Sequence, residues 1–524
     1  SLDLWRIDLP MQRSRRGSYG FGMLILSGAL AFGTTPLEVA AANQPSQAPV
    51  EFFGCTALKG TAQQFSCMLV PDDQLTLWVR GRDCKDIQVA DSGQPLQAET
   101  KFIQNGCQLR LPRSSGLHQS TLTLTDRRTQ QPLWSMPLDR SKPKLLATKR
   151  KVVEGRTGNL EDLLTELQRK ETQNLDPEGH IDVTYSLGWV NFRLGNIHEA
   201  VHKLSYVSSL ARTAGYISIS LNTNLRRATF LRKDGLVQEA QQIVAETAQL
   251  LIPAYMDDTI FYDWESALIE RASEHYESAA KGFDVVIAAA ERIDDRDYIA
   301  VATPISAETW LRLGRSDAAE RAIQGMELLM DGKSRCIQSA MLSNVASVGI
   351  QIMNDSGKQI AFVGRSLYAN ALLALEYERD CPTSNTRSKI LLLLAHIAHA
   401  NGRFKESRDW FEKSKALPWS AATARLERLE MEALLARGEG NTSEASRAYS
   451  AMMAEALKSN TAFHLQYLCD SVLGIAEMNQ LQGRVDEKID STIRTCLQSR
   501  ESGLAVPIFR HIERRSRALG FLPQ

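Results

Sequence analysis

The sequence predicts a mainly α protein: an α–α superhelical solenoid preceded by a small antiparallel β-sandwich domain. Two observations lead to this prediction. Short strand-like segments follow one another between residues 50 and 140. From residue 159 onward, helical hairpins recur to the end of the chain, which is typical of repeat proteins. We therefore expect four parts, at residues 1–42, 50–140, 141–158 and 159–524.

The first part is predicted to be a signal peptide. After Met11, three arginines within residues 13–16 precede an apolar stretch at 21–33. This stretch is shorter than the roughly 20 residues that span a membrane. The small residues Ala40–Ala42 then suit cleavage before Asn43. We expect a periplasmic or secreted protein with no stable membrane span after cleavage.

The second part is predicted to form the β domain. Its segments are short, rich in β-branched residues, often alternating, and bounded by Gly, Pro, Asp or Ser. They are QFSCMLV (64–70), QLTLWVRG (74–81), KDIQVAD (85–91), GCQLRLP (106–112) and STLTLTD (120–126). Several such runs in ninety residues favour a small antiparallel sandwich. The basic run 140–151 that follows is interpreted as a solvated linker.

Eight cysteines are expected to form disulfides, because their number is even and export exposes them to an oxidising compartment. None lies in a Cys-x-x-Cys pair, so the spacing supports neither zinc nor redox chemistry. Four cysteines of the β region permit three connectivities. Among these we favour Cys55 with Cys67 and Cys84 with Cys107.

The other four cysteines lie at the ends of predicted helices. Cys336 is near the start of one helix and Cys381 near the end of the helix that folds back on it. Cys469 and Cys496 have the same relation in the last hairpin. Because these ends are neighbours in an antiparallel hairpin, we predict the disulfides Cys336–Cys381 and Cys469–Cys496.

The third part is the linker, and the fourth is the repeat region. Asn159 is a plausible N-cap for its first helix. In most copies a turn glycine ends the first helix, and a small residue five positions later lets the second helix approach closely. The turn glycines are Gly195, Gly235, Gly314, Gly357, Gly402, Gly440 and Gly483, and adjacent ones are 38–45 residues apart. The copy at 264–283 has no turn glycine. Stacked hairpins of this period share one continuous core.

Three copies resemble the tetratricopeptide repeat (TPR) family: LGWVNFRLGNIHEAV (187–201), WLRLGRSDAAERA (310–322) and HANGRFKESRDWF (399–411). The resemblance covers roughly 180–500. The family's usual period of about 34 residues is exceeded, so HEAT-like repeats are the structural alternative. The resemblance implies a non-catalytic scaffold that binds a protein or peptide in a concave groove lined by the first helices.

The overall arrangement also resembles a second group of proteins. A signal peptide, a Cys-bearing β segment containing LTLWV (75–79) and divergent repeats are similar to the N-terminal half of secreted bacterial proteins that end in a caspase-like CHAT protease domain. The sequence reaches Gln524 still in a helical pattern. We expect either a stand-alone relative or the recognition arm of a larger CHAT-type cysteine protease.

The segment His198-Glu199-Ala200-Val201-His202 has the spacing of a zinc protease motif, in which two histidines bind zinc and the glutamate activates water. The repeat explains part of it, because Glu-Ala recurs at Glu239-Ala240. If Ala200 faces the partner helix, His198 and His202 point away from it. We expect a solvated surface; a metal site at His198 and His202, or a zinc metalloprotease, is the alternative.

His396 and His399 could also share a metal, although partly buried packing is the preferred interpretation. The tryptophans on the helices, Trp189, Trp264, Trp310 and Trp410, are expected in the core.

Lys plus Arg and Asp plus Glu are equal at 61 each, which disfavours nucleic acid as a partner. The sequence has no phosphate-binding glycine loop or Gly-x-Ser-x-Gly motif. We therefore expect a protein or peptide ligand, no cofactor and no enzymatic activity.

Overall fold

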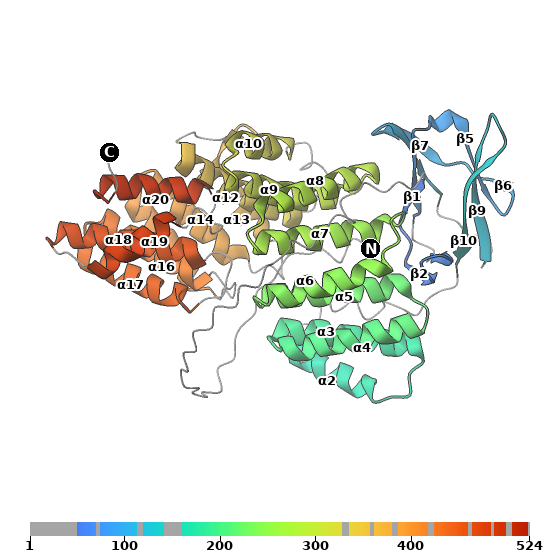
Figure 1. Ribbon diagram of the computed structural model, residues 1–524, viewed down its shortest axis with the longest axis horizontal. Coiled ribbons are helices and arrows are strands. Elements are labelled where there is room, and N and C mark those ends of the chain that lie inside the picture. The colour runs from blue at the N-terminus through green and yellow to red at the C-terminus, as the bar shows by residue number, and fades with distance from the viewer. Residues whose placement is uncertain are drawn as a thin grey trace.

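The computed structural model confirms the predicted fold class, a β region followed by a helical-repeat solenoid (Figure 1). It describes residues 50–69, 74–112, 119–140, 160–326, 335–356, 361–379, 386–417, 424–458, 464–483, 487–498 and 506–521. The predicted signal peptide and the predicted linker at 141–158 lie outside the described residues.

The β domain consists of two sheets that enclose one apolar core. One sheet has the order β1-β4-β8-β7 and the other β2-β3-β10-β9-β5-β6. The strands are β1 (Val50–Phe53), β2 (Ala57–Gly60), β3 (Phe65–Met68), β4 (Thr76–Arg80), β5 (Ile87–Asp91), β6 (Gln94–Pro95), β7 (Glu99–Ile103), β8 (Gly106–Arg110), β9 (Gln119–Asp126) and β10 (Pro132–Asp139). Their pairing is antiparallel apart from β3 with β10, which is parallel. Leu77 and Leu109 of the first sheet face Leu122 and Leu124 of the second in this core.

Three disulfides lie within the described residues, and all three pairings are those suggested from the sequence. Cys55–Cys67 and Cys84–Cys107 join segments of the β domain, with Cα–Cα distances of 5.5 and 4.9 Å. Cys469–Cys496 joins the last two helices of the repeat region, with a Cα–Cα distance of 5.7 Å. Cys381 and the side chain of Cys336 lie outside the described part of the chain.

The solenoid consists of antiparallel hairpins, each made of a first and a second helix. The pairs are α3 (Pro177–Leu194) and α4 (Ile197–Thr213), α5 (Ile217–Lys233) and α6 (Val237–Thr247), α7 (Met256–Ala272) and α8 (Tyr276–Arg292), α9 (Arg296–Arg312) and α10 (Ser316–Gly325), α12 (Arg335–Ser356) and α13 (Leu367–Glu378), α14 (Thr386–Ala400) and α15 (Phe404–Lys415), α16 (Ala424–Gly438) and α17 (Thr442–Ala456), and α18 (His464–Leu481) and α19 (Glu487–Gln498). Helix α2 (Leu160–Glu171) precedes them and α20 (Val506–Ala518) follows. A short hairpin, β11 (Ala361–Phe362) and β12 (Arg365–Ser366), stands between α12 and α13.

The turns explain why these hairpins recur. Gly195 and Gly235 adopt left-handed backbone conformations, with φ of 88° and 90°, as the sequence predicts. In the copy without a turn glycine, Glu274 takes the same conformation, with φ of 66°. The small residues after the turns, such as Ala200 and Ala240, are fully buried against the first helices.

The first helices form the inner side of the superhelix. Consecutive first helices pack on one another, as α5 does on α7, α9 on α12 and α12 on α14, and no consecutive pair of second helices in the described part makes comparable contact. Because neighbours converge on the inside of a curve, the first helices line the concave side. We call the surface that they form there the inner face.

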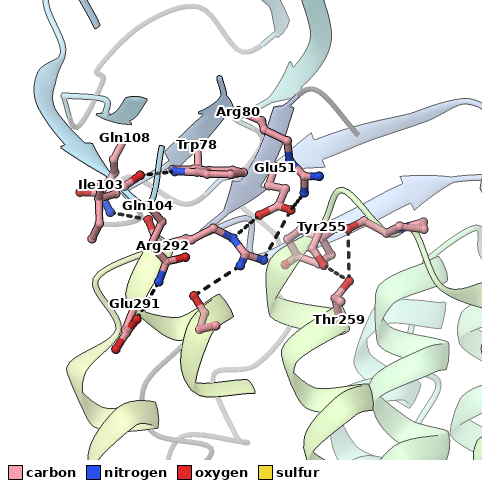
Figure 2. Close-up of polar contacts among 12 residues, drawn as sticks. Glu51, Trp78, Arg80, Ile103, Gln104, Gln108, Tyr255, Thr259, Glu291 and Arg292 are labelled. Carbon is pink, nitrogen blue, oxygen red and sulfur yellow. Dashed lines mark hydrogen bonds and ion pairs between the residues drawn. The ribbon is translucent and has the colours of Figure 1, made fainter. Parts of the chain in front are cut away.

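The β domain docks on the solenoid through a buried ion pair (Figure 2). The Glu51 carboxylate on β1 is fully buried and lies 2.8 Å from Arg292 Nε at the end of α8 and 3.4 Å from Arg80 on β4. Both guanidinium groups flank the Trp78 ring, at 5.2 and 5.6 Å from its centroid. The Gln108 amide also donates to the Arg292 carbonyl at 2.7 Å. These contacts fix the first sheet against α8.

Main-chain contacts extend this junction to the start of α5 and α7. The Leu58 N–H donates to Ser218 Oγ at 2.7 Å, and the Gly60 N–H donates to the Gly215 carbonyl at 2.8 Å. The Tyr255 hydroxyl donates to the Cys55 carbonyl at 2.9 Å. The domain therefore sits on the connections between successive hairpins, at the opposite end of the helices from turns such as Gly235 (Figure 1).

Candidate functional site

An aromatic cluster stands on the inner helices α3 and α5. Phe192 and Phe230 stack with ring centroids 3.7 Å apart and an interplanar angle of 4°. Trp189 meets the edge of this pair, at 5.2 Å from Phe230 and 6.1 Å from Phe192. The spacing of Trp189 and Phe192 along the helix places both on one side of α3. Trp189 remains partly exposed, whereas Phe192 and Phe230 are buried in the core beneath it.

Cations accompany the aromatic rings. The Arg226 guanidinium of α5 lies 5.1 Å from the Trp189 ring centroid and 4.6 Å from that of Phe261 on α7. Lys233 Nζ, at the end of α5, lies 5.7 Å from the Phe192 ring. Burial lowers the pKa of Lys233 to about 8, although the nearby Glu265 opposes this shift. Arg226 is buried, whereas Lys233 is partly exposed, so Lys233 places a positive charge at the surface beside these rings.

Ion pairs connect consecutive inner helices. The buried Glu265 of α7 accepts from Arg232 Nε at 2.7 Å and from the Thr229 hydroxyl at 3.0 Å, both on α5. Arg271 of α7 pairs with Glu308 of α9 at 2.7 Å. Burial raises the pKa of Glu308, but Arg271 and Arg312 outweigh it and lower the value to about 2. Glu308 is thus held charged, and both carboxylates are held in fixed positions by their partners.

The far end of the inner face is acidic. Glu427 and Glu430 lie on α16, and Asp470 and Glu477 lie on α18. Arg437 of α16 pairs with Glu477 at 2.7 Å. Burial, together with Asp470 and Glu427, raises the pKa of Glu430 to about 8, and Arg515 partly offsets this. Buried and partly buried carboxyl groups are thus gathered between α16 and α18 at this end of the inner face.

The histidine–glutamate motif lies on a second helix, outside this face. His198, Glu199 and His202 are exposed on α4, whereas Ala200 between them is fully buried against α3. Glu199 lies 3.8 Å from Lys203 Nζ. Among the described residues, no three His, Cys, Asp or Glu side chains are arranged to hold a metal ion. The buried Ala200 fits the repeat interpretation of the motif.

His396 and His399 of α14 lie near the inner face and are partly buried. Burial and the neighbouring His399 lower the pKa of His396 to about 4, so that it is neutral at pH 7. A ring nitrogen of His399 lies 3.0 Å from the Leu434 carbonyl of α16. This contact links α14 to α16 in the same way that ion pairs link the other inner helices.

The tryptophans divide between core and surface. Trp264 is buried and meets Phe283 edge-on at 5.5 Å, as expected for a core residue. Trp189, Trp310 and Trp410 are only partly buried. The sequence pattern did not identify Trp189 as part of the inner face, because its helical spacing is the same as that of a core residue.

Three solved structures are similar to this chain at low sequence identity and low structural overlap. A STAND-type signal transduction ATPase with a tetratricopeptide repeat sensor from Pyrococcus horikoshii is 14% identical over 72% of this chain and 63% of its own, with a TM-score of 0.40. Yeast Tom70 is 11% identical over 71% and 96%, with a TM-score of 0.25. The TPR domain of P58(IPK) is 15% identical over 71% and 98%, with a TM-score of 0.21. This chain thus spans less than two thirds of the first of these proteins.

No family model matches the chain, and no curated protein matches it in sequence. The described helices include none that is long and apolar enough to cross a membrane.

Proposed function

We propose that this protein is an exported scaffold that binds a segment of a partner protein along the inner face of its solenoid. The observation that supports this most is that Trp189 of α3 and Lys233 of α5 are both partly exposed over a buried cluster of aromatic rings and Arg226. Aromatic side chains and arginine are enriched where proteins bind one another.

The charge beside Trp189 indicates the chemistry of the ligand. Lys233 is partly exposed and lies 5.7 Å from the Phe192 ring centroid. Acidic side chains on a bound segment would complement this cation. The expected partner segment for α3–α7 therefore carries carboxylates.

Photo-crosslinking from two matched positions tests this proposal. A photoreactive phenylalanine analogue replaces either Trp189 on the inner face or Tyr206, which is 52% exposed on the outer helix α4. In extracts of the producing cells, we expect a discrete protein adduct from position 189 and none of that mass from position 206. Equal capture at both positions would refute binding on the inner face.

A charge variant then tests the chemistry of the captured partner. With purified partner, Lys233→Glu is expected to weaken binding by about tenfold or more, since it reverses a charge at the contact. Lys281→Glu is the control, because Lys281 is 66% exposed on the outer helix α8. An equal effect of both variants would indicate a non-specific charge interaction instead.

Export is the second element of the proposal, and the three disulfides of the described residues support it. Such bonds persist in oxidising compartments and are rare in the cytosol. Recovery of the protein in the periplasmic fraction or medium, with an N-terminus near Asn43, is the expected result. The larger arrangement, in which the scaffold is the recognition arm of a CHAT-type protease, stays a prediction that the coding sequence around this chain tests.

A further inference from the structure

Helix α20 lies across the inner face instead of simply ending the solenoid. It packs on α18 and α19 of the last hairpin, and also on α9 and α12 from the middle of the chain. Figure 1 shows α20, in red, running between the side of α12 and the C-terminal end. Since α9, α12 and α18 are all first helices, α20 spans the concave side between them.

One side of α20 is bound to the acidic end of the inner face. Arg515 lies 3.0 Å from Glu477 and 3.8 Å from Asp470, both on α18. Ile512 and Ser516, one turn apart, are fully buried on the same side of the helix. The Gln480 side chain of α18 donates to the carbonyl of Leu519 at 2.7 Å. Ile512 and Arg515, three residues apart on one side of α20, thus contact the inner face.

The other side of α20 is basic and exposed. Arg510, Arg514 and Arg517 are solvent-exposed, and Glu513 is the one acidic residue of the helix. The helix is therefore a basic amphipathic segment that contacts Asp470 and Glu477 of α18. Together with Glu427 and Glu430 of the neighbouring α16, these residues form what we call the acidic patch. Burial and Asp470 disfavour the charged form of Glu430, and the positive charge of Arg515 partly offsets this effect.

The described part of α20 buries fewer side chains than most repeat helices do. Among the described side chains of α20, Ile512 is the one fully buried apolar group, whereas α17 buries Tyr449 and Met452 along with three alanines. The buried hydroxyl of Ser516 has no hydrogen-bond partner within the described residues. Leu519 and Phe521, which follow the helix, are partly buried and pack against the core of the last hairpins. Because the described contacts of α20 with other helices are fewer than those of α17, we expect α20 to leave its site more readily than a repeat helix does.

We propose that α20 is an internal occupant of the acidic patch, and that a partner protein displaces it with a basic amphipathic helix of the same pattern. This proposal rests on the proposed function of the inner face as a protein-binding surface. It names a second kind of segment, basic and helical, for the α16–α18 end, in contrast to the acidic segment expected at α3–α7.

Binding of a synthetic peptide to the full-length chain tests this. The probe is a fluorescent peptide of residues 503–521, which must compete with α20 in the intact protein. Arg515→Glu places a carboxylate beside Asp470 and Glu477 and should release α20. We expect this variant to bind the peptide at least about tenfold more tightly than the wild type, the effect of one charged hydrogen bond.

Two variants control for charge and for folding. Arg517→Glu makes the same charge change at a residue that is 45% exposed and paired with Glu513 of its own helix, so it should bind the peptide as the wild type does. Arg515→Glu combined with Glu477→Arg restores the pair in reverse and should return affinity to the wild-type level. A folded Arg515→Glu variant that binds no better than the wild type would overturn the proposal.

Hydrogen exchange of the wild-type chain gives a second test if Arg515→Glu does not fold. Excess unlabelled peptide should speed exchange of the α20 amides while leaving those of α17 unchanged. Unchanged α20 exchange at saturating peptide would show that α20 is a permanent cap. Peptide binding and α20 exchange are both measured without the crosslink at position 189. If crosslinking at position 189 alone fails, the proposed function at α3–α7 is rejected. If the peptide fails to compete with α20, the role of α20 alone is rejected.

Discussion

Removal of the Glu51 carboxylate is expected to loosen the β domain from the solenoid. This carboxylate is fully buried and has two cationic partners of different exposure: Arg292 at 16% and Arg80 at 38%. The half-exposed pair with Arg80 contributes at most about 1 kcal/mol. Breaking a buried pair by removing one partner costs about 3–5 kcal/mol, because Arg292 stays buried without its counter-charge. We therefore expect Glu51→Ala to lower the free energy of opening the junction by about 3–5 kcal/mol.

Native-state hydrogen exchange measures this opening at a single amide. The Leu58 N–H donates to Ser218 across the junction, so its exchange reports separation of the two parts. An effect of 3–5 kcal/mol corresponds to roughly 10²–10⁴-fold faster exchange. The Leu124 amide, within the second sheet, should change much less. A change below about 1 kcal/mol at Leu58, or an equal change at Leu124, would refute the reasoning.

Two further variants separate the contributions. Arg80→Ala should change Leu58 exchange by less than about 1 kcal/mol, because its pair with Glu51 is half-exposed. Glu51→Leu combined with Arg292→Met replaces the pair by apolar groups and should recover most of the loss, since buried ion pairs are often no more stabilising than well-packed apolar side chains. Failure to recover would indicate that the Trp78 contacts of Arg292 dominate instead.

Three predictions concern the stability of the solenoid. Gly474→Ala should destabilise it by about 1–3 kcal/mol in urea unfolding, because the new methyl carbon would lie 2.5 Å from the rigid Tyr449 ring. Gly188→Ala should lower the free energy of unfolding by less, because its methyl group would meet the flexible end of the Leu204 side chain. Glu274→Gly should stabilise by about 0.5–1 kcal/mol, since glycine adopts the left-handed turn without strain; a loss of stability would contradict this. The folded-state pKa of Glu430 is raised from its ordinary 4.5 to about 8, so the stability that its protonated form contributes is full below pH 4.5 and is lost as pH rises through 8. Glu430→Gln should therefore flatten the fall in melting temperature between pH 5 and 9. Parallel melting-temperature curves for the variant and the wild type would reject this assignment.

The repeat architecture was predictable because its determinants are local. A turn glycine such as Gly195 and a small residue such as Ala200 act within one hairpin, so their spacing is visible in the sequence. Strand β10 was not predicted, because Pro132 and Pro137 remove backbone donors and interrupt the alternation expected of a strand. It nevertheless pairs on both sides, and its parallel partner β3 is more than sixty residues away in sequence.

The candidate site was less predictable than the fold. Its contacts join residues of different repeats, as in Arg271 with Glu308 or Arg437 with Glu477. Such pairs depend on how far one hairpin rotates on the next, which no pattern within a hairpin specifies. The seating of α20 on α9 and α12 depends on the sum of these rotations over several repeats. The sequence therefore indicated a concave groove but not which charges meet in it.

The two ends of the inner face differ in which helices supply the cations that pair with their carboxylates. At α5–α9, carboxylates such as Glu265 and Glu308 are already paired with arginines on neighbouring helices, so a ligand does not need to order them. At α16–α18, by contrast, Arg515 of α20 supplies a cation that a partner must replace. Binding at the first end should therefore depend mainly on the ligand's own contacts. Binding at the second end is reduced by the fraction of time that α20 occupies the patch. A partner that carries both an acidic and a basic segment would bind both ends of one chain, and its affinity would respond to Arg515→Glu and to Lys233→Glu in opposite directions.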